Sequence, residues 1–233
     1  MSAEAVDATI ATRISVGFHV LPEAVSARLP EPWTSPPATK DPRDAVNVVM
    51  IFSDALLNQD ALGEASAEDV SRSLIFLAPA VHPDNQQRSS FVFRIFTSHP
   101  EGVPGKYSNS LQASLKREQR TESVGLETRV SELIDLAAPD DGRIELRMRY
   151  LRNAPARVQN ESTVRSATDE DVVRVYRTDE LTDVLLDLPG GVDRIQYYEF
   201  RSTVGEFGDL FDGSERVVSI KVSPWYVREV FPG

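Results

Sequence analysis

Apolar and polar residues alternate with a period of two along most of this 233-residue chain. In residues 143–152, for example, Ile144, Leu146 and Met148 alternate with charged residues. A period of two places successive side chains on opposite faces of a β-strand. Turn-forming sequences such as Asp140-Asp141-Gly142 separate these segments. The pattern predicts a mainly β protein whose strands are antiparallel.

The same pattern predicts where the remaining elements lie. We expect strands at residues 12–20, 46–52, 73–80, 90–98, 172–177, 194–202 and 216–222. Residues 111–120 and 122–136 fit strand and helix equally well. Short helices are predicted at 22–29, 180–186 and 204–211, and residues 224–232 are expected to fold back onto the body as a helical turn.

About nine or ten strands in one domain must avoid leaving exposed sheet edges, and closing or stacking the sheet achieves this. We find no linker, no repeat and no low-complexity segment. The predicted fold is therefore mainly β (α+β), an antiparallel β cone or barrel with a central pocket and a few short helices. Residues 1–233 are predicted to form one domain.

Composition excludes several classes of function. A net charge of −11 disfavours nucleic acid and anionic membranes as partners. The chain has no cysteine, and its three histidines are too far apart in sequence to suggest a metal site. We therefore predict no metal and no cofactor. No stretch of about 18 apolar residues is present, and residues 1–11 lack a signal-peptide pattern, so a cytoplasmic location is expected.

Several cationic residues alternate with core-type residues in the predicted strands. They face either solvent or the lumen of the barrel, and periodicity alone does not decide between these two orientations. If two of them point inward, the pocket is cationic and selects a carboxylate or another anion. The residues concerned are Arg94, Arg147, Arg149, Arg174 and Lys221.

The order of four short motifs resembles that of the acetoacetate decarboxylase-like superfamily. The likeness extends over most of the chain. The motifs are Arg13-Ile14-Ser15-Val16, Leu21-Pro22-Glu23-Ala24-Val25, Leu29-Pro30-Glu31-Pro32 and Val103-Pro104-Gly105-Lys106-Tyr107.

This resemblance implies a β cone or barrel around a buried pocket. In decarboxylating members of the superfamily, one of two adjacent lysines forms a Schiff base with a β-keto acid, and the second cation lowers its pKa. Here Gln112 and Ala113 stand near the place of that pair, and Lys116 with Arg117 follows a few residues later. Neighbouring residues on a strand point to opposite faces, which would separate Lys116 from Arg117.

The resemblance therefore predicts an altered chemistry in an inherited pocket. The predicted enzyme acts on a keto acid or a polyketide-like carbonyl compound, in a lyase, aldolase-dehydratase or isomerase type of reaction without classical decarboxylation. Arg13, which matches an arginine near the substrate in the family, and Arg94 are predicted to bind the carboxylate. The candidate catalytic residues are Lys116, Tyr107, Asn109 and Gln112.

Two alternatives stay open. The first is a noncatalytic barrel that binds a hydrophobic carboxylate between aromatic walls, with Phe91, Phe93, Phe96 and Tyr150 as candidates. The second is a structural protein or a homo-oligomer, since Trp225 and Tyr226 form an apolar cluster near the end of the chain, although this cluster would also serve to seal one mouth of the barrel.

Overall fold

The computed structural model describes residues 5–36, 41, 45–65, 71–99, 107 and 109–233. Its strands form two sheets, one of nine strands and one of four. Helical structure in the described residues is limited to α1 (Pro22–Ser26) and the 3-10 turn Gly205–Phe207. The prediction of a mainly β fold is confirmed.

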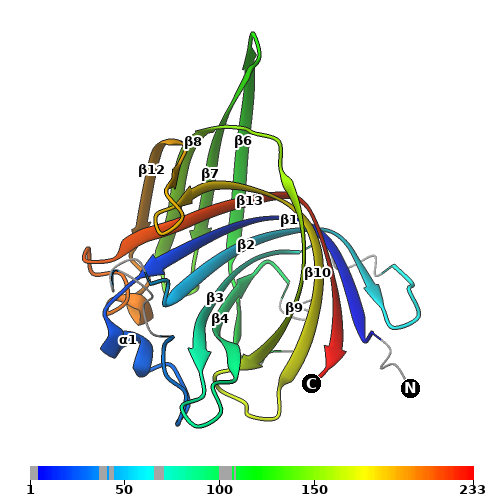
Figure 1. Cartoon of the computed structure of the whole chain (residues 1–233), viewed down its shortest axis with the longest axis vertical. Coiled ribbons are helices and arrows are strands. Elements are labelled where there is room, and N and C mark those ends of the chain that lie inside the picture. The colour runs from blue at the N-terminus through cyan, green and yellow to red at the C-terminus, as the bar shows by residue number, and fades with distance from the viewer. Residues whose placement is uncertain (1–4, 37–40, 42–44, 66–70, 100–106, 108) are drawn as a thin grey trace.

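The larger sheet closes into a seven-stranded barrel, which is the body seen in the lower part of Figure 1. All neighbours around the ring are antiparallel except β4 and β9, whose short parallel pairing closes it. Two short strands pair alongside the ends of barrel strands: β5 (Ser110–Gln112) pairs with β4, and β11 (Val192–Asp193) pairs with β10. In ring order the barrel strands are β10 (Val173–Asp187), β13 (Arg216–Pro232), β1 (Asp7–His19), β2 (Val48–Asp60), β3 (Arg72–Val81), β4 (Arg88–Thr97) and β9 (Ala156–Ser166).

The second sheet packs against the outside of the barrel. Its order is β12 (Ile195–Ser202), β8 (Arg143–Leu151), β7 (Glu127–Ala137) and β6 (Ser114–Val124). One face of this sheet and the outer face of β1, β2 and β3 contribute to one apolar cluster, which includes Ile14, Phe18, Phe76, Ile134 and Leu146. The main hydrophobic core therefore lies between the two sheets, and the barrel interior is a separate space.

Alternation along the strands divides the side chains between these two spaces. On β1, Ile14, Val16 and Phe18 belong to the core, while Thr9 and Arg13 face the barrel interior. The nearly continuous apolar sequences of β2 and β3 have the same explanation, because both faces of these strands are covered.

The prediction of helices at 180–186 and 204–211 is wrong for most of these residues. Residues 180–186 belong to β10, and only Gly205–Phe207 are helical in the second segment. Register shifts at Leu181/Asp183 and Val184/Leu186 interrupt the two-residue period, leaving Leu181, Val184 and Leu185 with a helix-like spacing. Residues 224–232 are likewise not a helical turn but the end of β13.

The two ambiguous segments are strands. Residues 114–124 form β6 and residues 127–137 form β7, joined at Gly125, whose φ of 63° suits a tight hairpin turn. No helix among the described residues is long and apolar enough to cross a membrane.

Candidate functional site

The barrel encloses a cavity of about 310 Å³. One side of it is apolar and belongs to β2, β3, β4 and β9, with Ile51, Ile75, Leu77, Val92, Ile95 and Val164. The other side is polar and carries charged groups, phenols and hydroxyls. Its members include Thr9, Arg13, Ser53, Asn58, Tyr176, Glu180, Tyr226 and Arg228. Such a cavity suits a small molecule with one polar end and one apolar end.

Arg228, on β13, lies deep inside the barrel on the cavity wall. Its Nη2 donates to Thr9 Oγ1 at 3.1 Å, and its guanidinium carbon lies 4.9 Å from the centroid of the Tyr176 ring. The buried Nε has no hydrogen-bond partner. Arg228 makes no ion pair with any carboxylate in the described part of the chain. Asp7 is near enough to interact electrostatically with Arg228 but forms no ion pair with it, so an anionic ligand in the cavity would be the first carboxylate to pair with this guanidinium directly.

Arg13 supplies a second cation to the same cavity. Its guanidinium carbon stacks 4.1 Å from the centroid of the Tyr226 ring, and it too lacks a carboxylate partner among the described residues. Glu180 is the carboxylate of the cavity wall and accepts a hydrogen bond of 2.6 Å from Ser223 Oγ. Tyr226 lies directly across the β10–β13 pair from Glu180, so these groups share one region of the wall.

Two phenols meet on the wall. The hydroxyl oxygens of Tyr107 and Tyr176 are 2.7 Å apart. Because one hydroxyl donates to the other, the second keeps a hydrogen that a ligand oxygen can accept. Burial, reinforced by the neighbouring Tyr176, raises the pKa of Tyr107, and burial raises the pKa of Tyr176 as well. Both phenols therefore stay protonated at neutral pH.

Comparison with known proteins identifies the fold. The sequence matches no protein-family model and no curated protein. Among solved structures, the enduracididine biosynthesis enzyme MppR matches with a TM-score of 0.56 and 14% identity, over 98% of this chain and 86% of that one. An acetoacetate decarboxylase-like enzyme from Sphingomonas wittichii matches with a TM-score of 0.54 and 8% identity, over 100% and 92%. Acetoacetate decarboxylase from Legionella pneumophila gives 0.51 and 8%, over 97% and 85%.

The chain has the acetoacetate decarboxylase-like fold. At these identities the likeness establishes the fold alone. The predicted resemblance to this fold is thus confirmed, and the cavity lies inside the barrel that the fold forms.

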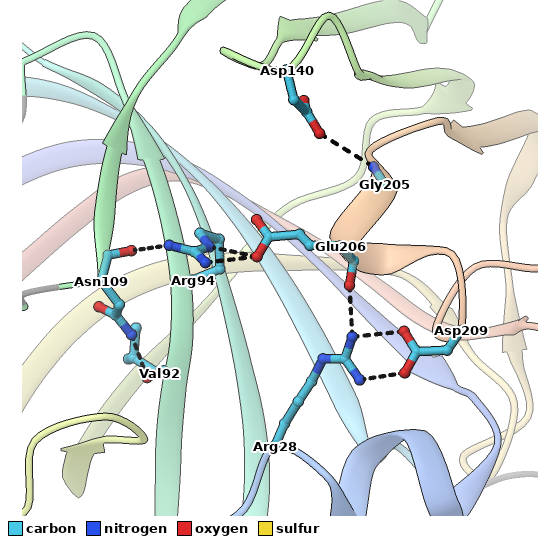
Figure 2. Close-up of polar contacts among 8 residues, drawn as sticks. All are labelled: Arg28, Val92, Arg94, Asn109, Asp140, Gly205, Glu206 and Asp209. Atoms are coloured by element: carbon cyan, nitrogen blue, oxygen red, sulfur yellow. Dashed lines mark hydrogen bonds and ion pairs between the residues drawn. The ribbon is translucent and has the colours of Figure 1, made fainter.

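Within this fold, Arg94 does not line the cavity. Figure 2 shows its guanidinium turned toward the 3-10 turn, where it holds Glu206 at 2.6 Å. Its Nη1 also donates to the backbone oxygen of Asn109 at 3.2 Å. Beside it, Arg28 clamps Asp209 and donates to the backbone oxygen of Glu206. Arg94 attaches the 3-10 turn to barrel strand β4, and Arg28 attaches it to the segment after α1, so the contacts of Arg94 are structural.

The predicted catalytic residues Tyr107, Asn109 and Gln112 lie in three different environments. Tyr107 lines the cavity, as Arg13 does. Asn109, two residues after Tyr107, is buried, and its side-chain nitrogen donates to the backbone oxygen of Val92 at 2.8 Å. Gln112 is exposed at the end of β5. The structure therefore brings two of the six predicted residues, Arg13 and Tyr107, to the cavity wall.

Lys116 lies outside the cavity, on the outer face of the second sheet. Its side chain is 63% exposed and pairs with Glu118. The hydrogen bond that Lys116 donates to this carboxylate raises the pKa of Lys116, the opposite of what an amine nucleophile needs. Lys221 is also exposed. No lysine among the described residues lines the cavity, while Lys40 and Lys106, with the Val103–Lys106 motif, lie outside those residues.

The structure decides between the two orientations left open for the other cations, and it places the candidate aromatic wall elsewhere. Arg147 and Arg149 are exposed on the second sheet, and Arg174 donates to the backbone oxygen of Val173. The proposed aromatic wall does not face the barrel interior either, because its rings are used in packing elsewhere. Phe93, Phe96 and Tyr150 belong to the main core, and Phe91 packs on Trp33.

Sequence reasoning missed Arg228, Tyr176 and Glu180. Each lies in a segment where the two-residue alternation was available: Tyr176, Thr178 and Glu180 on β10, and Tyr226 and Arg228 on β13. Predicting helical structure for residues 180–186 and 224–232 hid this signal for Glu180 and Arg228, whereas Tyr176 lies in the predicted strand 172–177, whose inner face the alternation alone did not identify.

Proposed function

We propose that this protein is a small-molecule enzyme that binds a keto acid or a related carbonyl compound in the barrel cavity and catalyses proton transfer at the carbon beside the carbonyl. The observation that carries the proposal is the pair of cavity arginines, Arg13 and Arg228, neither of which forms an ion pair with a carboxylate among the described residues. An acid with one carboxylate and one carbonyl matches their donors, because planar guanidinium groups bind such oxygens in pairs.

The chemistry follows from the other polar groups on the wall. Glu180 would take a proton from the carbon next to the carbonyl, and the electrons of that C–H bond would move to the carbonyl oxygen to give an enolate. The Tyr107–Tyr176 pair keeps one free O–H to donate to this oxygen as its negative charge develops. Ser223, through its hydrogen bond of 2.6 Å, would orient Glu180.

This step is common to the aldolase-dehydratase, lyase and isomerase reactions that the sequence suggested, since each passes through an enol or enolate. It requires no amine nucleophile, which agrees with the placement of Lys116 on the outer surface. Support also comes from structures of MppR, which has been solved with pyruvate and with the condensation product of pyruvate and imidazole 4-carboxaldehyde.

The direct test is exchange of substrate C–H protons with deuterium. The purified chain is incubated in D₂O with pyruvate, 2-oxobutyrate and longer 2-oxo and 3-oxo acids, and proton loss is followed by NMR. We expect catalysed exchange for at least one acid, its loss in Glu180→Gln, and weakened binding in Arg13→Ala. Arg94→Ala is the matched control and should retain binding, because Arg94 pairs with Glu206 away from the cavity.

The alternative function is a noncatalytic barrel that holds a hydrophobic carboxylate. The apolar wall formed by Ile51, Ile75, Leu77 and Val92 favours it. Tight binding of the longer acids without any exchange, and with equal affinity in Glu180→Gln, would establish this alternative. Failure of every acid to bind would overturn both functions. Borohydride reduction in the presence of the same acids, followed by mass mapping, tests separately for a lysine adduct.

A further inference from the structure

β6 is an uncovered edge of the second sheet. Among the described residues it pairs with β7 alone, over eleven residue pairs. Every residue from Glu118 to Val124 is exposed, and the β6–β7 hairpin rises clear of the rest of the molecule in Figure 1. A long, straight edge of this kind presents unpaired backbone N–H and C=O groups that a further strand can bind.

The outward-facing side chains of β6 alternate in charge. They are Lys116, Glu118, Arg120 and Glu122. Within one chain they pair along the strand, Lys116 with Glu118 at 2.5 Å and Arg120 with Glu122 at 2.6 Å. Arg120 is 79% exposed. These charges therefore remain accessible to a second molecule.

The order of these charges is complementary to itself when the strand is reversed. If a second β6 lies antiparallel with Gln119 opposite Gln119, then Lys116 faces Glu122 and Glu118 faces Arg120. Each pair occurs twice because the arrangement is two-fold symmetric. Moving the centre by one residue, to Glu118 or Arg120, places like charges opposite each other, which destabilises paired strands. Registers centred on Arg117 or Thr121 bring only one kind of opposite-charge pair together, so the charge order favours the register centred on Gln119, which forms both kinds.

We propose that the chain forms a homodimer by antiparallel pairing of β6 with β6 of a second copy, centred on Gln119, so that the two four-stranded sheets become one continuous sheet. The occupant of the edge is a second copy because the charge pattern complements itself. Lys116, a candidate nucleophile from sequence, has its role at this interface, paired with Glu122 of the second copy.

A pair of opposite charge changes tests the register. In Glu118→Arg, positions 118 and 120 are both positive, and in Arg120→Glu both are negative. Each variant alone places like charges opposite each other and should raise the dimer dissociation constant at least about tenfold. Mixed together, the two variants restore opposite charges at every contact and should form a heterodimer. Sedimentation velocity and light scattering of the full chain measure all three samples, with wild type as reference.

Because the chain contains no cysteine, single cysteines report the register independently. Gln119→Cys should form a disulfide-linked dimer on mild oxidation, whereas Thr121→Cys, which would lie opposite Arg117, should not. Circular dichroism spectra and thermal melts confirm that each variant is folded. A monomeric wild type at millimolar concentration, or single charge variants that dimerise as well as wild type, would overturn the proposal. Neither result bears on deuterium exchange in the barrel cavity, so the two proposals fail independently.

Discussion

The phenol oxygens of Tyr107 and Tyr176 lie 2.7 Å apart on the wall of the barrel cavity, and the guanidinium of Arg228 lies over the Tyr176 ring. This contact links a residue after β4 to a residue of β10, two parts of the chain that are 69 positions apart. Burial raises the pKa of both phenols, so the pair is a neutral hydrogen-bond donor next to a cation.

Replacing Tyr176 with Phe removes one of the two hydroxyls and leaves the other without its partner. We expect the free energy of unfolding to fall by about 1–2 kcal/mol, the usual cost of a lost buried hydrogen bond. Exchange of substrate protons should slow more strongly than binding weakens, because the lost donor serves the enolate. Urea denaturation and NMR exchange measure the two effects. An equal loss of binding and rate would instead indicate that the pair only binds substrate.

Replacing Arg228 with Met should separate stability from binding. Met fills similar space without a buried charge, so the free energy of unfolding should not fall and should rise by up to about 3 kcal/mol. Affinity for keto acids should fall at least about tenfold, or about 1.4 kcal/mol, because the cation proposed to bind the carboxylate is lost. Arg228→Lys, which keeps the charge, is the control and should bind better than Arg228→Met. A destabilised Arg228→Met protein with unchanged affinity would contradict this role.

The sequence predicted the barrel, and it named two residues, Arg13 and Tyr107, that the structure places on the cavity wall. Alternation along regular strands is visible in one dimension, and Arg13 lies on such a strand. Arg94 also alternates, yet it faces Glu206, which is 112 residues away in sequence. Which side of a strand is the inside depends on partners of this kind, and no local pattern contains that information.

Glu180 and Arg228 were not predicted as cavity residues for a different reason. β10 contains register shifts at Leu181/Asp183 and Val184/Leu186, and these bulges change a two-residue period into a spacing typical of a helix. Glu180 lies next to the first shift, at the start of the segment whose pattern predicts a helix. On β13 the cluster around Trp225 suggested a folded-back tail, whereas the strand continues through Tyr226 and Arg228 to Pro232.

The ion pair between Arg117 and Glu132 is predicted to be a major contribution to the packing of the two sheets. Glu132 is only 1% exposed and accepts from Arg117 at 2.8 Å and from Gln119 at 2.5 Å, while Arg117 also donates to Thr12 on the barrel. Glu132→Ala leaves the buried guanidinium of Arg117 with only the more distant Asp54, at 3.6 Å, and should lower the free energy of unfolding by about 3 kcal/mol. Glu145→Ala, in the exposed pair with Arg147, should cost less than about 1 kcal/mol. If both variants lost a similar free energy of unfolding, the Arg117–Glu132 ion pair would not be a major contribution to the packing of the two sheets.

Asp7 gives the stability a pH dependence whose sign can be worked out. Burial raises its pKa above the ordinary 3.8, despite the opposing charges of Arg228 and Arg174. The folded protein therefore holds this proton more tightly than the unfolded chain does. The contribution of protonated Asp7 to stability is therefore fully present below pH 3.8 and is lost as the pH rises through the pKa of Asp7 in the folded protein. Asp7→Asn should raise the free energy of unfolding at pH 7, and this gain should disappear as the pH falls below about 4.

The control for Asp7 is Asp179, where the sign is reversed. Hydrogen bonds from Arg157 and Gln159 lower the pKa of Asp179 to about 2, so its contribution is present above the ordinary value of 3.8 and is lost as the pH falls toward 2. Asp179→Asn should therefore reduce stability at pH 7, and its difference from wild type should shrink in acid. Urea denaturation between pH 3 and 7 measures both variants. If Asp7→Asn were less stable than wild type at pH 7, the attraction of Asp7 to Arg228 and Arg174 would outweigh its burial, and the raised pKa would be wrong.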